Sequence, residues 1–178
     1  MRSYLLANAV VASVLLGSVS LASAATATAN LTVTAQVNTN CSISTAPVAF
    51  GVYDPITAHA TTPLDATGTV TVACTKNAAP NIGLGLGNNA SGSVRRMSDG
   101  GTERLNYELY KPSNNAAGAA CSYLTPAVWG TTIATDTLLI TAAPSKAGRT
   151  YNVCGRVASG QDPAPGNYTD TVLATVTF

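Results

Sequence analysis

The chain is poor in the side chains from which active sites are usually built. It has one histidine, His59, and charged residues make up only 10% of its 178 residues. A Ser-His-Asp or Cys-His arrangement would have to use His59, which lies in the polar stretch PITAHATTP, and this stretch has the composition of an exposed loop. No two of the four cysteines are close in sequence, which argues against a zinc site. We therefore predict no enzyme, no catalytic residue, no metal and no cofactor.

Long hydrophobic runs are also absent, except for one at the start of the chain. Residues 5–21 are apolar apart from Asn8 and small residues, Arg2 precedes them, and the tripeptide ASA at 22–24 follows. This pattern is typical of a secretory signal and predicts residues 1–24 as a signal peptide, cleaved after Ala24. The alternative, a transmembrane helix, needs about 20 predominantly apolar residues.

Net charge is absent as well. Removal of Arg2 with the signal leaves eight basic and eight acidic residues in a mature chain of 154 residues (178 minus 24). No basic face for a nucleic acid is implied, and charge repulsion does not oppose self-association. The length suits one domain, predicted over residues 38–178.

Three motifs attract attention but predict little chemistry. The stretch GLGLG does not have the spacing of a phosphate-binding loop, and a strand with one apolar face explains it better. Asp162 and Asp170 are read as solvated turn residues, and the run RRM at 95–97 as a solvated loop. No convergent polar cluster predicts a small-molecule substrate.

The mature chain begins with a long alternating run, ATATANLTVTAQV at residues 25–37. Every odd position is apolar and every even position is polar, which is the period of a strand with one buried face. A lone strand is not stable in water, so some sheet must receive it. The residues themselves leave two alternatives open: the strand packs on its own domain, or it completes a neighbour.

Short alternating runs separated by Gly, Pro, Asn and Ser continue through the rest of the chain. Examples are GTVTVAC, RLNYELY, TYNVCGRV and the C-terminal NYTDTVLATVTF. Segments 55–68, 88–103 and 141–149 are read as loops. Because no stretch shows a helical period with caps, we predict an all-β sandwich or barrel.

The cysteines are even in number in a chain predicted to be exported, which favours disulfides. Pairing in order, one of three possible connectivities, joins Cys41 to Cys74 and Cys121 to Cys154. Cys74 shares a face with Val70 and Val72, so its bond is predicted to lie in the core. Cys154 alternates with Val153, so its bond is predicted to be peripheral and to tie the segment KPSNNAAGAAC to a strand.

Several segments together resemble the spore coat protein U domain family, which includes pilin subunits of archaic chaperone–usher fimbriae. They are PVAFGVYDP, ATGTVTVACT, LNYELY, VWG and, most specific, the C-terminal YNVCGRV…GQDPAPGNYTDTVLATVTF. The resemblance implies an incomplete immunoglobulin-like β-sandwich that is completed by a donated N-terminal strand. Cys41 and Cys74 fall where the family's disulfide is expected.

The resemblance also implies partners: identical or related pilin subunits, a periplasmic chaperone and an outer-membrane usher. It places the protein outside the cell after passage through the periplasm, in a fimbrium or on the cell surface. The implied donor residues are Ala29, Leu31, Val33, Ala35 and Val37. The implied chaperone-facing residues of the last strand are Val172, Ala174, Val176 and Phe178. The alternative is a coat or surface protein of the same family that does not polymerise.

Overall fold

The structure, a computed structural model, describes residues 23–178, so the predicted signal peptide lies almost wholly outside the described residues. Two units are distinguished, Met1–Gln36 and Val37–Phe178. In the first, residues 23–36 are exposed and carry no strand. None of the described residues forms a helix long and apolar enough to cross a membrane.

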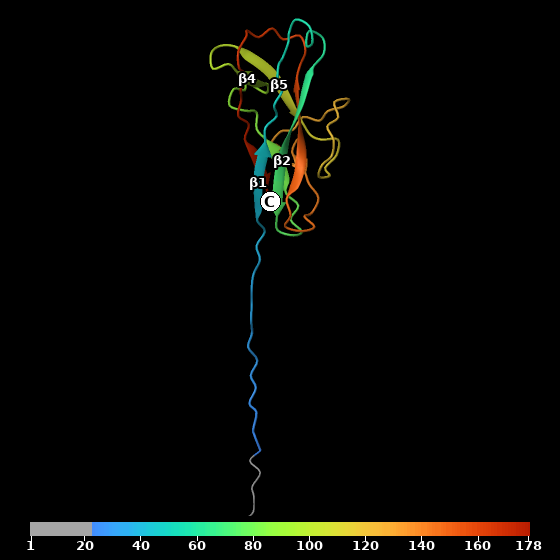
Figure 1. The fold of residues 1–178 in the computed structure, drawn as a ribbon. Coiled ribbons are helices and arrows are strands. Elements are labelled where there is room, and N and C mark those ends of the chain that lie inside the picture. Colours follow the sequence, from blue (N-terminus) through green and yellow to red (C-terminus); the bar gives the residue numbers. More distant parts are fainter. Residues whose placement is uncertain (1–22) are drawn as a thin grey trace, which may run out of the picture. The chain divides into compact units, whose positions relative to one another are not determined.

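The second unit is an all-β sandwich, and the described part of the chain contains no helix (Figure 1). Eight strands form it: β1 (Cys41–Ala46), β2 (Leu64–Cys74), β3 (Asn81–Leu84), β4 (Arg95–Ser98), β5 (Arg104–Tyr110), β6 (Leu138–Leu139), β7 (Arg149–Val157) and β8 (Ala174–Thr177). One sheet has the order β1-β2-β7-β5-β4, and the other has the order β6-β3-β8. All pairs are antiparallel.

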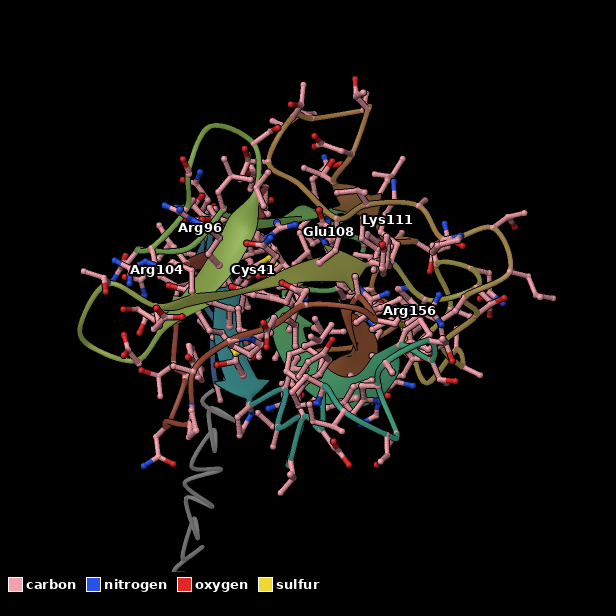
Figure 2. The ribbon with its side chains drawn as sticks, turned by 90° about the horizontal axis from the view of Figure 1, so that it is seen from above. Cys41, Arg96, Arg104, Glu108, Lys111 and Arg156 are labelled. Carbon is pink, nitrogen blue, oxygen red and sulfur yellow. A yellow bond between two sulfur atoms is a disulfide. The ribbon has the colours of Figure 1, made fainter. Side chains whose placement is uncertain are left out.

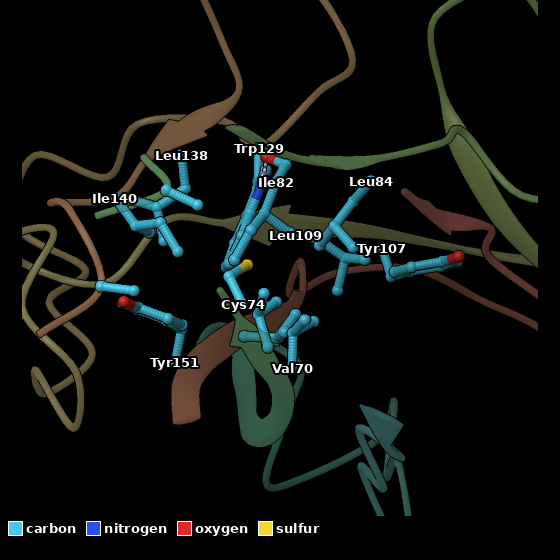
Figure 3. Close-up of a cluster of buried hydrophobic side chains, with 14 of the residues drawn as sticks. Val70, Cys74, Ile82, Leu84, Tyr107, Leu109, Trp129, Leu138, Ile140 and Tyr151 are labelled. Carbon is cyan, nitrogen blue, oxygen red and sulfur yellow. Dashed lines mark hydrogen bonds between the residues drawn. The ribbon is translucent and has the colours of Figure 1, made fainter. Parts of the chain in front are cut away.

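The core lies between the two sheets and confirms the faces predicted from alternation. Val70 and Val72 of β2 and Leu105 and Leu109 of β5 are buried, as expected for one face of each strand. Trp129, from the segment between β5 and β6, is fully buried, and its Nε1 donates to the carbonyl oxygen of Ile82 at 2.8 Å. Figure 3 shows this indole against the side chains contributed by both sheets.

Two loop predictions were wrong. Strand β2 begins at Leu64, inside segment 55–68, and β4 lies inside segment 88–103. Arg95, predicted to lie in a solvated loop, is the first residue of β4 and is 0% exposed. Its Nη2 donates to the carbonyl oxygens of Leu84 (2.9 Å) and Trp129 (2.6 Å), and its Nη1 pairs with Glu108. The five donors of a guanidinium allow this group to be buried when carbonyls surround it.

The chain after β1 crosses the inner face of the five-stranded sheet over two glycines. A Cβ atom on Gly68 would come 2.7 Å from Val48 Cγ2, and one on Gly155 would come 2.8 Å from Phe50 Cζ. Any side chain at either position would therefore push the segment outward. The two glycines of β2 and β7 seat residues 47–50 against the core.

The cysteines pair as Cys41–Cys74 and Cys121–Cys154. Cys74 is buried in the core cluster, as predicted. Cys154 lies outside that cluster, and its bond ties the segment after β5 to β7, as predicted, but Cys154 is 0% exposed and so does not lie at the solvent-exposed surface. The segment between β5 and β6 covers it: Tyr123 donates to the carbonyl oxygen of Gly155 at 3.1 Å, and Arg156 lies 4.3 Å from the Tyr123 ring centroid.

We expect the two disulfides to stabilise the domain about equally. Both close loops of the same sequence separation, 33 residues, and each has one buried cysteine. The loop-entropy model gives roughly 3–4 kcal/mol for each. Urea unfolding of Cys41→Ser/Cys74→Ser and of Cys121→Ser/Cys154→Ser should show similar losses. A loss twice as large in one variant as in the other would contradict this expectation.

Candidate functional site: an apolar groove between two strand edges

Strands β1 and β8 belong to different sheets but lie next to each other across an opening in the sandwich. Each is the edge of its sheet: β1 pairs with β2, and β8 pairs with β3. The end of β1 at Ala46 and the start of β8 at Ala174 line the same hollow, so the two strands run in opposite directions. Both therefore present a strand edge to the opening.

The backbone hydrogen bonds show which residues face it. The amide of Thr75 donates to the carbonyl oxygen of Asn40 at 2.9 Å, and residues alternate in an antiparallel ladder, so Ile43 and Thr45 direct their backbone groups away from β2. On the other side, the amide of Gly85 donates to the carbonyl oxygen of Leu173 at 2.9 Å, so Ala174 and Val176 direct theirs away from β3. Both edges therefore direct backbone donors and acceptors toward the opening.

Beneath the opening is a groove of about 480 Å³ whose walls are mostly apolar. Its lining comes from both sheets and from the segment after β1, and includes Val48, Phe50, Val70, Leu84, Met97, Tyr107, Leu109, Val153, Val172 and Ala174. Val48, Phe50, Met97 and Val172 pack against the core but remain only partly buried. The groove is thus a part of the hydrophobic core that the described chain does not cover.

One end of the groove is closed by a polar cluster. The hydroxyl of Tyr107 donates to Asp170 Oδ2 at 2.7 Å, and the backbone and side-chain amides of Asn89 each donate to Oδ1 at 3.1 Å. Asp170 is therefore partly buried and bonded, and its reading as a solvated turn residue was wrong; Asp162 is exposed as predicted. Burial, together with the adjacent Asp170 carboxylate, raises the pKa of Tyr107 well above its ordinary value, so the phenol stays protonated.

The arrangement is suited to binding a chain rather than to bond-breaking chemistry. His59 stacks on Tyr53 with ring centroids 5.1 Å apart, in the loop between β1 and β2, and is not part of the groove lining. Within residues 23–178, no three His, Cys, Asp or Glu side chains gather closely enough to hold a metal ion. Apolar walls and two strand edges favour an extended apolar segment as occupant.

The predicted site residues fall into two groups. Val172 and Ala174 line the groove, Val176 packs against the same core, and Phe178 is 57% exposed beyond the end of β8. The five predicted donor residues are all exposed, with Leu31 at 88% and Val33 at 85%, and their role stays a prediction. Val48 and Phe50 form one wall of the groove, and sequence reasoning missed them. The signal was present: the two apolar residues stand two positions apart in the stretch PVAFG, so that their side chains point the same way in an extended chain.

Comparison with known proteins places this sandwich in a family. A family model described as Spore Coat Protein U domain matches residues 27–175. The chain belongs to this family, which confirms the resemblance.

A relative agrees with this assignment, and a solved structure has a similar fold. Protein U of Myxococcus xanthus is 35% identical over 183 residues, covering 96% of this chain and 95% of that protein. The fold is similar to that in the chaperone–tip adhesion subunit pre-assembly complex, CsuC-CsuE, from archaic chaperone-usher Csu pili of Acinetobacter baumannii. The TM-score is 0.53 at 21% identity, over 80% of this chain. The match spans 40% of the length of that solved chain.

Proposed function

We propose that the protein is a structural subunit of a surface fibre, assembled when residues 25–37 of one copy fill the groove of the next. The observation that carries this proposal is the groove, which offers apolar walls and two strand edges to an extended segment. The alternating run ATATANLTVTAQV has the pattern that such a groove would take: apolar side chains inward and polar side chains outward. Because each copy would give a strand at one place and accept one at another, the contact is heterologous and produces an open filament.

The energetics favour this use of the segment. Burial of Leu31, Val33 and Val37 would contribute about 1.5–3 kcal/mol each, with main-chain pairing in addition. The alanines at 29 and 35 contribute less area, but they permit a close approach to the groove. All five donor residues are exposed.

The same groove explains why partners would be needed before assembly. Two exposed strand edges and an uncovered core are aggregation hazards. We propose that a periplasmic chaperone pairs with β8 over Val172, Ala174 and Val176 during export and that an outer-membrane usher receives the subunit. The pilus complex to which the fold is similar contains a chaperone, which supports the chaperone as a partner before assembly. The protein would then act outside the cell, in a fimbrium or on the surface.

A second function is favoured by the family's own description as a spore coat domain. In that case the protein would be a coat or surface protein that does not polymerise, and residues 25–37 would fold back into their own groove.

A denaturing gel of the exported protein separates the two functions. Fibres joined by inserted strands should run without heating as a ladder of multimers that collapses to one band on boiling, because a buried strand is released only on unfolding. The monomer recovered before assembly should co-purify with the chaperone. A single monomeric band without heating, from protein that is folded and free of chaperone, would contradict polymerisation and support the coat protein.

A further inference from the structure

The end of the domain at which β1 begins is positively charged. Lys76 and Lys146 are exposed and, with Asn40 and Cys41, line a hollow of about 570 Å³. Arg149, the first residue of β7, lies at the same end because it pairs with Val72 of β2. The segments that form this basic end, residues 38–42, 73–81 and 141–150, contain no Asp or Glu.

The opposite end is negatively charged. Three loops meet there, 51–63, 99–103 and 158–170, and they carry five carboxylates: Asp54, Asp99, Glu103, Asp162 and Asp170. Hydrogen bonds join the loops: the amide of Gly160 donates to the carbonyl oxygen of His59 at 2.9 Å, and that of Ala164 donates to Glu103 Oε2 at 3.3 Å. The acidic end is thus a fixed surface.

Nearby basic residues do not cancel this charge. Arg104 lies 4.0 Å from Asp99, and Arg96 of β4 donates to the carbonyl oxygen of Asn89 at 3.0 Å, so two guanidinium groups face five carboxylates. Both arginines are seen from this end in Figure 2. Arg156 is bound in a two-point ion pair with Asp65 (2.6 and 2.7 Å) and adds no net charge. Hydrogen bonds from Thr57 and Ile56 lower the pKa of Asp54 to about 2, so this group stays ionised.

The edges of β1 and β8 run between the two ends of the domain. Ile43 and Val176 lie on these edges toward the basic end and do not line the groove. Asp170 lines the groove and lies at the acidic end, where the amides of Ser98 and Thr169 each donate to the other residue's carbonyl oxygen at 2.9 Å. Only residues 38–40 separate a donated strand from Cys41 of its own domain. Three residues span at most about 10 Å, so the basic end of the donor must lie close to the point where its strand leaves the groove.

The direction of the strand decides which charges meet. A strand that runs in the direction of β1 leaves at the acidic end, so opposite charges face each other. A strand that runs the other way leaves at the basic end, so like charges face each other. Building on the proposed function, we propose that Lys76 and Lys146 of one copy dock on the acidic loops of the next, around Asp99, Glu103 and Asp162. This contact is separate from the strand in the groove, and its partner is a second copy of this chain.

The contact predicts a salt-dependent rate of assembly. Exposed charges within about 10 Å interact at low ionic strength and are screened at high salt. Complementary patches raise association rates roughly 10- to 1,000-fold, and reversal of one patch removes this gain. Because all the lysines and carboxylates to be changed are at the surface, their reversal should leave the melting temperature of the monomer almost unchanged.

The test reverses the charge of each end separately and then of both ends together. Purified exported protein is compared with Lys76→Glu/Lys146→Glu, with Asp99→Lys/Asp162→Lys and with the chain that carries all four changes. Fibre growth is followed by light scattering at low and high salt. Each double variant should grow at least about tenfold more slowly than wild type at low salt. The fourfold variant should regain most of the rate, because its reversed ends again match.

Controls separate this contact from the donated strand. Lys111 directly follows β5, whose last residue pairs with Cys154, and Cys154 in turn pairs with Thr67 in the middle of β2, so Lys111 lies between the two ends. A chain with Lys111→Glu should form fibres at the wild-type rate; Figure 2 labels Lys111. Wild-type rates in both double variants at low salt, or a fourfold variant no faster than the doubles, would overturn the ionic contact while fibre formation stands. Failure of the wild-type chain to form fibres would overturn the proposed function and the contact with it.

Discussion

Leu31→Asp is expected to abolish fibre formation while leaving the domain folded. Leu31 is 88% exposed in the single chain, so a carboxylate there meets water and should not disturb folding. In a neighbour's groove the same carboxylate would lie among apolar side chains with no cation to pair with. Burial of an unpaired charge costs several kcal/mol even after relaxation, which exceeds the about 1.5–3 kcal/mol that the leucine contributes.

The matched control is Thr32→Asp, one residue away on the opposite face of the strand. Its side chain would point to solvent after donation, so its fibres should form nearly as well as those of wild type. Size-exclusion chromatography and thermal melting measure both variants. If Leu31→Asp unfolds the monomer, residues 25–37 fold back into their own domain. A folded Leu31→Asp protein that still forms fibres would contradict both uses of the strand.

Arg95→Met is expected to destabilise the domain more than any other change of a charged side chain. The substitution leaves the carbonyl oxygens of Leu84, Gly85 and Trp129 without their donor and Glu108 without its partner. Glu108 is 26% exposed, so its charge is partly solvated after the change, and the main loss is that of the charged hydrogen bonds to the carbonyl oxygens. Hydrogen bonds to a charged group contribute about 1.5–3 kcal/mol each, so we expect a loss of about 3–5 kcal/mol and a melting temperature lower by about 6–20 °C.

Arg96→Met is the control for Arg95→Met, because it removes the neighbouring guanidinium, which is partly exposed and donates to Asn89. Its cost should stay below about 1 kcal/mol. Arg95→Lys tests whether the several donors of the guanidinium are needed. An ammonium group keeps the charge but cannot replace a guanidinium that donates to three carbonyl oxygens, so most of the loss of stability should persist. Equal melting temperatures for Arg95→Met and Arg96→Met would show that the buried network contributes little.

Alternation of apolar and polar residues predicted the inner faces of the long strands, because each of these strands has one solvent-exposed face and one buried face. Val70 and Val72 in β2 and Leu105 and Leu109 in β5 follow this rule, and the structure confirms them. The rule fails where another segment covers the outer face: Cys154 faces away from the core, yet the chain around Tyr123 buries it. It also fails for Arg95, since a sequence does not reveal that the carbonyl oxygens of Leu84, Gly85 and Trp129, from two distant segments, gather around one side chain.

The groove was beyond reach of residue patterns for a different reason. It is defined by a strand that the sheets lack, and its walls come from both sheets and from residues 47–50 directly after β1, which are drawn from segments far apart in sequence. Only the family resemblance suggested an open sandwich. The alternating run at 25–37 could be predicted as a strand directly, because it is long and regular. The strands with which it would pair could not be predicted, because they are far from it in sequence.

The open groove makes the stability of this domain a quantity that depends on concentration. Any chain that binds the folded groove and not the unfolded polypeptide raises the free energy of unfolding by mass action. A ligand present at 100 times its dissociation constant adds about 2.7 kcal/mol, and a tenfold higher ratio adds about 1.4 kcal/mol more. Thermal denaturation should therefore depend on protein concentration wherever copies occupy one another's grooves. A single melting temperature does not characterise such a domain unless the occupant of the groove is stated.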